Sequence, residues 1–268
     1  MNTPTLTGRR TTEVDTPQER PLLSTTPGVV ALPTSEIGRF MLFTISLAGT
    51  RQPLGSRIHA AASANVTENL NSVIREMLPE EGWVWVLGDD HVWPNDTLQV
   101  LLAEMDAHPE IDILVPLVVK RNPPWVPVLY HKLDQFDENG IQLLRTYAFQ
   151  EIPAEGVFEV DAAGSAGMLI RREVLDTLGD PWFNSTPDKE GRQVVLNEDI
   201  TFCLRAREAG FTVWATTAAT MGHLGIYNVR PVRHPESGAW VALTEFSSAD
   251  EQFQHLFMPL GPNEEQEA

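Results

Sequence analysis

Short apolar runs alternate with amphipathic stretches along the middle of the 268-residue chain. Residues 40–45 and 83–87 are almost wholly apolar and predict two buried β-strands, and residues 111–117 predict a third. Residues 212–215 predict a returning strand further along. Continuous apolar runs of this length are typical of strands that are covered on both faces.

Helices are predicted between these strands because apolar residues recur at every third or fourth position. The recurring positions are Val66, Leu70, Val73 and Met77 in one segment, and Leu98, Leu101, Leu102 and Met105 in the next. Asn95 or Asp96 can cap the second of these helices. Two later helices are expected to begin near Arg171 and after Asn197.

Strands that are separated by helices need crossover connections, which give a largely parallel sheet. The sequence therefore predicts an α/β fold with a mostly parallel central sheet and helices on both faces. Ligands of such sheets bind beyond the carboxyl ends of the strands. Asp89 and Asp90, which follow the strand predicted at 83–87, are expected at that edge.

Composition divides the chain into three parts. Residues 1–35 are rich in Thr, Pro and Ser with little periodicity and predict a flexible N-terminal extension. Residues 36–232 carry the alternation of predicted strands and helices, and they are long enough to form one catalytic domain. Residues 233–268 are expected to form a C-terminal extension with an acidic tail.

The charge balance restricts the partners. The chain has 19 Lys and Arg against 37 Asp and Glu, a formal net charge of −18. Such a chain repels nucleic-acid backbones and anionic membrane surfaces, so neither is an expected partner. If the ligand is a phosphate compound, this balance favours a bridging metal cation.

Cysteine content and the ends of the chain suggest a compartment. The only cysteine, Cys203, excludes an intrachain disulfide and a Cys-rich zinc site. Residues 1–20 are polar, unlike a secretory signal, and no apolar run is long enough to span a bilayer. We therefore expect a cytoplasmic protein.

Three acidic and imidazole side chains are the first candidates for chemistry. Asp89 and Asp90 are adjacent at a predicted strand end, where a divalent cation would relieve their repulsion; an ordinary acidic turn explains them equally well. His223 lies between Gly222 and Gly225 and is either a metal ligand or a plain loop residue.

Two further segments have both a structural and a chemical interpretation. Glu198 and Asp199 open a predicted helix, where the helix dipole stabilises carboxylates even without a function. The small-residue run Gly164, Ser165, Ala166 and Gly167 either lets backbone N–H groups approach a ligand or only permits tight packing.

The order of these segments suggests a family. Gly88-Asp89-Asp90-His91 after a strand, the run 164–167 followed by Arg171 and Arg172, Glu198-Asp199 opening a helix, and Gly222-His223-Leu224-Gly225 together resemble GT-A glycosyltransferases, especially the family-2-like group. The resemblance covers roughly residues 38–230. It implies a Rossmann-like GT-A domain and a metal-dependent, hexosyltransferase-type activity. The donor would be a nucleoside diphosphate sugar, and the acceptor would be a hydroxyl of a glycan, protein or small molecule.

The resemblance also implies roles for single residues. Asp90 matches the second Asp of the family's Asp-x-Asp motif, which binds Mn²⁺ or Mg²⁺, and a late histidine such as His223 often completes that metal site. Asp199 matches the general base of the inverting members, and Glu198 would bind the acceptor or orient the loop. In a retaining enzyme the pair would instead bind and position the substrate. The run 164–167 would contact the donor.

One position departs from the family pattern. Gly88 stands where the first Asp of the motif is expected, so Asp89 is the candidate to take over part of the donor binding. The departure leaves open a sugar-nucleotide-binding or structural protein without catalysis. A sugar nucleotidyltransferase is a weaker alternative, because residues 48–51 (Ala-Gly-Thr-Arg) poorly imitate its Gly-rich basic loop.

Three tryptophans are candidate acceptor contacts. Trp93, Trp125 and Trp182 are expected in loops around the proposed site, and aromatic faces pack well against the C–H surfaces of sugars. Ordinary hydrophobic packing explains each of them as well.

Overall fold

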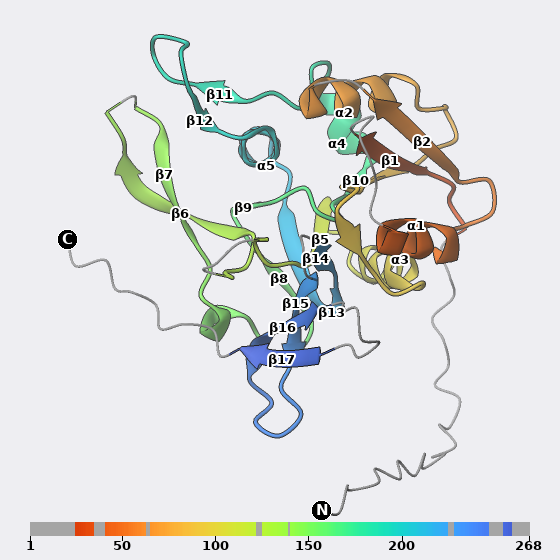
Figure 1. Ribbon diagram of the computed structural model, residues 1–268. Coiled ribbons are helices and arrows are strands. Elements are labelled where there is room, and N and C mark those ends of the chain that lie inside the picture. Colours follow the sequence, from red (N-terminus) through yellow and green to blue (C-terminus); the bar gives the residue numbers. More distant parts are fainter. Residues whose placement is uncertain are drawn as a thin grey trace, which may run out of the picture.

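The computed structural model describes residues 25–34, 41–62, 65–121, 125–138, 140–224, 228–246 and 254–258. Its centre is a seven-stranded sheet (Figure 1). In spatial order the strands are β2 (Arg57–Ala62), β1 (Val29–Thr34), β3 (Trp83–Val86), β10 (Leu169–Arg171), β5 (Ile113–Leu117), β13 (Val213–Thr220) and β8 (Val157–Glu159). β1 pairs in parallel with β2 and β3, and β5 pairs in parallel with β13, whereas β10 and β8 are antiparallel to their neighbours. The predicted mostly parallel α/β sheet is confirmed.

Helices cover both faces of this sheet, as predicted. They are α1 (Met41–Gly49), α2 (Val66–Arg75), α3 (Thr97–Ala107), α4 (Arg172–Leu178) and α5 (Glu198–Glu208). Successive residues of β1 point to opposite faces. Val29 and Ala31 share a core with α2, α4 and α5, whereas Val30 and Leu32 share the other core with α1 and α3.

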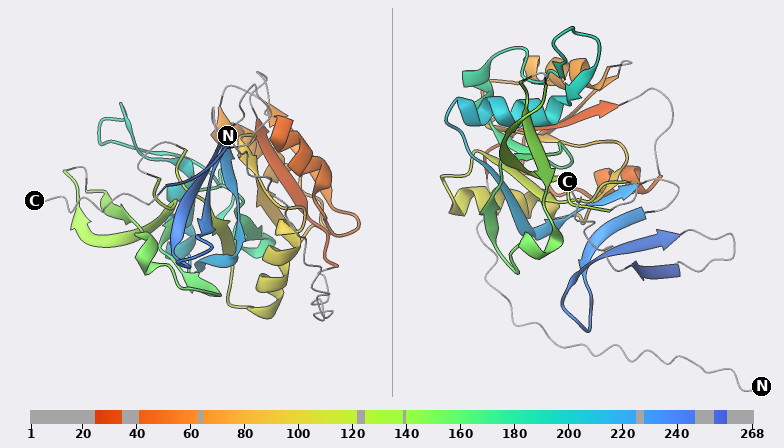
Figure 2. Two further views of the ribbon diagram at one scale, coloured as in Figure 1. Left: turned by 60° about the horizontal axis from the view of Figure 1, so that its bottom comes forward. Right: turned by 90° about the vertical axis from the view of Figure 1, so that its left-hand side faces the viewer.

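Three smaller sheets surround the centre. The strands of the five-stranded sheet are β17 (Gln254–Met258), β16 (Trp240–Phe246), β15 (Asn228–Arg233), β14 (Gly222–Leu224) and β4 (His91–Val92). The other two consist of β7 (Gln142–Thr146), β6 (Leu129–Phe136) and β9 (Ala162–Ala163), and of β11 (Thr186–Pro187) with β12 (Val194–Leu196); a 3₁₀ turn, η1, spans Phe149–Glu151. Figures 1 and 2 show the β6–β7 and β11–β12 hairpins projecting on the same side of the molecule.

The strand predicted at residues 40–45 is wrong. Met41 to Gly49 form the helix α1, in which Phe43 and Ser46 are buried and Met41 is 72% exposed. A short run that is apolar on all sides has no period that separates a strand from a helix. Phe40 lies outside the described residues.

The first strand of the sheet lies instead at Val29–Thr34, inside the predicted N-terminal extension. All six residues are buried, so the prediction of a flexible extension is wrong for this segment. Residues 1–24 lie outside the described part of the chain. The boundary at 232/233 is also wrong, because it cuts through β15 and separates β14 from the strands β16 and β17 of the same sheet.

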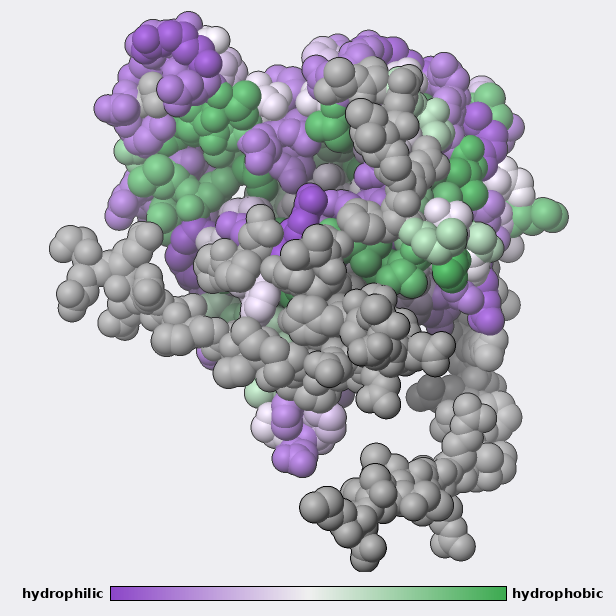
Figure 3. Space-filling view, viewed as in Figure 1, coloured by the Kyte–Doolittle hydropathy of each residue, from purple (hydrophilic) through white to green (hydrophobic). Residues whose placement is uncertain are grey.

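Exposed apolar side chains gather on the two projecting hairpins. Phe136 of β6, Leu143 of β7, and Val194 and Val195 of β12 are all exposed. The space-filling view shows hydrophobic residues there, beside the hydrophilic tip of the β11–β12 hairpin (Figure 3). No helix among the described residues is long and apolar enough to cross a membrane.

Candidate active site

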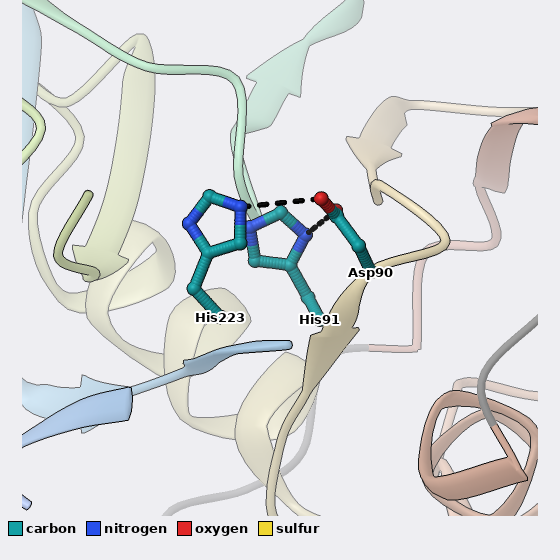
Figure 4. A group of neighbouring side chains, drawn as sticks. All are labelled: Asp90, His91 and His223. Carbon is teal, nitrogen blue, oxygen red and sulfur yellow. Dashed lines mark hydrogen bonds and ion pairs between the residues drawn. The ribbon is translucent and has the colours of Figure 1, made fainter. Parts of the chain in front are cut away.

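Three side chains that could hold a metal ion meet at one point. The candidate ligand atoms of Asp90, His91 and His223 lie within 4.8 Å of one another (Figure 4). The Oδ2 atom of Asp90 is 3.2 Å from Nε2 of His223, and its Oδ1 atom is 2.8 Å from Nδ1 of His91. The two residues that the sequence assigned to a metal, Asp90 and His223, are therefore brought together across 133 positions of the chain.

The pairing of two short strands produces this cluster. β4 follows the central strand β3, and β14 follows β13, so both leave the central sheet at the same edge. They pair antiparallel with His91 opposite His223. Opposite residues of such a pair have Cβ atoms about 5 Å apart, and the two imidazole rings stack with centroids 4.4 Å apart.

A backbone carbonyl orients the imidazole of His223, whereas His91 is buried without such a partner. Nδ1 of His223 lies 3.1 Å from the carbonyl oxygen of Val119, to which an Nδ1–H can donate, and Nε2 of the same ring faces Oδ2 of Asp90. His91 is 5% exposed, and its Nε2 atom is buried without a hydrogen-bond partner in the described part of the chain. Buried polar atoms usually have a partner.

The carboxyl group of Asp90 is held in its charged form. Burial favours the neutral acid, but hydrogen bonds and charge interactions with His223 and His91 outweigh it and place the pKa of Asp90 well below its usual range. One carboxylate and two imidazoles form a donor set that suits Mn²⁺ better than Mg²⁺, which prefers oxygen ligands. The residues therefore fit a manganese-like cation.

Gly88 and Asp89 explain the departure from the Asp-x-Asp pattern. A Cβ atom on Gly88 would lie 2.8 Å from Nδ1 of His91 and 2.9 Å from Oδ1 of Asp90. A side chain at this position would therefore displace Asp90 and His91 from their present contacts. The Asp89 side chain turns toward β1 instead, where its Oδ2 atom accepts a hydrogen bond of 2.6 Å from the hydroxyl of Thr34.

Restoring the missing aspartate is expected to damage the cluster. In Gly88→Asp the new side chain must push Asp90 and His91 apart, so we expect Mn²⁺ to bind about tenfold more weakly, the cost of one lost charge-assisted contact. Isothermal titration with Mn²⁺ measures this. Leu54→Asp is the control, because it adds the same charge at a side chain that is 98% exposed. An unchanged or tighter affinity in Gly88→Asp would contradict the steric argument.

Asp199 and the run 164–167 form a second group. The Oδ2 atom of Asp199 accepts a hydrogen bond of 3.3 Å from the backbone N–H of Ser165, and its Oδ1 atom accepts one of 2.8 Å from Ile200. Burial, and then the charge of Glu198, raise the pKa of Asp199 to about 6. A carboxylate with this pKa is a better proton acceptor near neutral pH than an ordinary aspartate.

The small-residue run is tightly packed at both ends. A Cβ on Gly167, where φ is +72°, would lie 2.4 Å from the sulfur of Met221, and one on Gly164 would lie 3.2 Å from Cβ of Val128. These contacts favour the packing alternative for the two glycines. The half-buried Ser165 and Ala166 are the members that face less crowded space.

The neighbouring charge of Glu198 offers a test of the raised pKa of Asp199. In Glu198→Gln this charge is lost, so the pKa of Asp199 falls and the acid limb of the rate profile is expected to move to lower pH by about half a unit. The pH dependence of kcat/KM measures it. Glu173→Gln, on another helix, is the control; a limb that moves upward or stays in place would exclude coupling between the two carboxyl groups.

The three candidate tryptophans differ in surroundings. Trp93 is 5% exposed, makes edge contacts to Phe43 and Trp85, and is a core residue rather than an acceptor contact. The indole N–H of Trp182 donates to the carbonyl of Leu175, and its ring packs on the core. Trp125 is half-buried in the segment that follows β5.

Sequence reasoning missed three residues of the site. His91 was not assigned as a ligand but belongs to the metal cluster. Arg121 places a guanidinium nitrogen 2.7 Å from Oδ2 of Asp90. Tyr130 is the third, because burial and then the charge of Asp199 raise its pKa. The adjacency of His91 to Asp90 was the one signal in the sequence. Arg171 and Arg172, by contrast, donate to backbone carbonyls of other elements.

Comparison with known protein families gives the identity of the domain. The family model described as "Glycosyltransferase like family 2" matches residues 48–244. The chain belongs to this family. Membership in the family 2-like glycosyltransferases confirms the resemblance of the sequence motifs and supports a role in glycosyl transfer. A comparison with curated protein sequences found no match.

Solved structures confirm the GT-A fold of this family 2-like domain. The crystal structure of A197 from STIV matches with a TM-score of 0.52 and 13% identity, over 75% of this chain and 88% of that one. GalNAc-T7, solved with UDP, GalNAc and Mn²⁺, matches with a TM-score of 0.52 and 12% identity, over 74% of this chain and 43% of that one. At such identities the likeness concerns the fold alone.

Proposed function

We propose that this chain transfers a sugar from a nucleoside diphosphate sugar to an acceptor hydroxyl, with a divalent cation held by Asp90, His91 and His223. The observation that carries the proposal is the convergence of Asp90 and His223 at 3.2 Å beside the central sheet. The family membership and the match to GalNAc-T7, whose structure contains UDP and Mn²⁺, support it.

The three ligands prepare a site for negative charge. A bound Mn²⁺ would supply positive charge to the diphosphate as it leaves. The protein contributes the orientation of the ligands: Val119 fixes the ring of His223, and the pairing of β4 with β14 fixes His91 against it. Asp89, whose carboxylate accepts a hydrogen bond from Thr34, is the proposed contact to the donor nucleotide.

Asp199 is the proposed general base. The acceptor oxygen forms a bond to the anomeric carbon, the bond from that carbon to the diphosphate oxygen breaks, and the acceptor proton moves to a carboxylate oxygen of Asp199. Its pKa of about 6 leaves it ionised at neutral pH and able to accept a proton. Glu198 keeps that pKa raised, and Ser165 orients the carboxylate through its N–H.

Trp125 is the proposed acceptor contact. It lies four residues after Arg121, whose guanidinium contacts Asp90. Trp93 and Trp182 are left out because packing and a backbone hydrogen bond occupy them.

The test is release of nucleoside diphosphate from UDP- and GDP-sugars, with and without Mn²⁺. Metal-dependent release that rises on addition of an acceptor hydroxyl supports the proposal. Calorimetry separates the rival function: binding of UDP or GDP with Mn²⁺, without any release of diphosphate, would indicate a sugar-nucleotide-binding protein. The sugar nucleotidyltransferase alternative needs a Gly-rich loop at residues 48–51. It is not supported, because Ala48 and Gly49 are the last two residues of the helix α1.

A further inference from the structure

Arg121 makes the closest ion pair of Asp90. Its Nη2 atom lies 2.7 Å from Oδ2 of Asp90, the same oxygen that faces Nε2 of His223 at 3.2 Å. The Arg121 side chain is 50% exposed, whereas that of Asp90 is 20% exposed. A half-exposed cation thus contacts a mostly buried carboxylate, on an oxygen that is also a candidate metal ligand.

The segment that carries Arg121 also braces the metal cluster. After β5 the chain turns back on itself, with hydrogen bonds from the N–H of Val128 to Val118 and from the N–H of Lys120 to Val126. Val119 lies at the base of this turn and accepts the hydrogen bond of His223. Arg121 lies two positions further along the chain, and half of its side chain surface is exposed.

Other basic residues near the central strands are already engaged. Arg171 donates to the carbonyls of Ile111 and Met105, and Arg172 donates to those of Leu78 and Glu81. These bonds tie elements of the fold together. Within the described part of the chain Arg121 is paired with a candidate metal ligand instead, so its release by a competing cation breaks no other bond between the described elements.

We propose that Arg121 is an exchangeable counter-cation of the Asp90 site: it pairs with Asp90 before metal binds, and it then turns to the diphosphate of the donor. This inference rests on the proposed function. A metal ion at Asp90 repels the guanidinium, and the incoming diphosphate presents pairs of oxygens that the planar fork of an arginine binds well. In a chain with a net charge of −18, this arginine gives the anion a positive partner beside the metal.

Two affinities test the exchange. In Arg121→Ala the competitor of the metal is gone, so Mn²⁺ alone is expected to bind about tenfold more tightly than to wild type, as for one lost charge-assisted hydrogen bond. UDP or GDP with saturating Mn²⁺ is expected to bind about tenfold more weakly. Isothermal titration measures both, without any need for turnover. Arg121→Lys keeps the positive charge, so its affinity for Mn²⁺ should be close to that of wild type.

A matched control and a fold check separate the outcomes. Arg192→Ala removes the same charge from a side chain that is 73% exposed, and both affinities should stay at wild-type values. Circular dichroism and thermal unfolding confirm that the variants fold. If wild type binds Mn²⁺ and nucleotide but Arg121→Ala binds Mn²⁺ no more tightly, the exchange is overturned and the proposed function stands. If wild type binds neither nucleotide with Mn²⁺, both fail.

Discussion

Replacing Asp90 by alanine or asparagine is expected to lower metal-dependent transfer by about a thousandfold or more, the scale of losing the charge stabilisation of a leaving group. Asp90 is the only carboxylate in the described metal cluster, and both of its oxygens face imidazoles. Without its charge, only the two imidazoles of the described cluster remain to hold the cation. Release of nucleoside diphosphate over a series of Mn²⁺ concentrations measures the loss.

The control for this prediction is an aspartate outside the cluster. Asp176, 63% exposed on α4, pairs only with Arg172 among the described residues, so Asp176→Asn should keep wild-type turnover. Excess Mn²⁺ is expected to recover part of the activity of Asp90→Asn, since a weakened site still fills at high concentration. Equal metal-dependent turnover by wild type and Asp90→Ala would remove Asp90 from the mechanism.

The metal cluster shows how far sequence reasoning reaches. Asp90 follows a strongly patterned strand, and His223 follows the returning strand, so both are expected at the carboxyl edge of a parallel sheet. His91 and Arg121 could not be assigned in this way. His91 faces His223 only because β4 and β14 are two- and three-residue strands that pair in one register, and Arg121 depends on the path of an irregular turn.

The fold was predictable where apolar residues repeat with a clear period. The buried side of α3 was identified from the spacing of its apolar residues, and the wholly buried strand β3 was identified from a continuous run of β-branched and aromatic residues. The helix α1 was not, because exposed Met41, Leu42 and Ile45 extend its apolar character around the helix. The strand β1 was missed because it follows a Thr- and Pro-rich stretch and itself contains Pro33, which composition alone associates with a loop.

Replacing Asp199 by asparagine is expected to lower transfer by about a hundred- to ten-thousandfold, the usual range for loss of a general base. Asparagine has nearly the same shape and can still accept the hydrogen bond of Ser165, so positioning is largely kept while the proton acceptor is lost. The measurement is kcat at saturating donor and acceptor. Unchanged KM values with a lowered kcat would identify a chemical rather than a binding defect; an unchanged kcat would exclude Asp199 as the base.

The same substitution is expected to stabilise the fold, and more so at alkaline pH. The pKa of Asp199 is about 6 in the folded chain and about 3.9 when unfolded. As pH rises between these values, the unfolded chain releases the proton first, so the wild-type fold loses stability until pH passes 6. At about 1.4 kcal/mol per pKa unit the full penalty is about 2–3 kcal/mol, and Asp199→Asn escapes it.

Thermal unfolding at two pH values isolates this electrostatic contribution. Asparagine loses one hydrogen-bond acceptor toward Ile200 at every pH, which costs roughly the same at pH 5 and pH 8. The difference between the two pH values therefore reports the buried charge alone. We expect the advantage of Asp199→Asn over wild type to be about 1 kcal/mol larger at pH 8, or about 2–4 °C in Tm. Asp176→Asn should show no such difference, and a pH-independent effect in Asp199→Asn would mean that Asp199 is not held with a raised pKa.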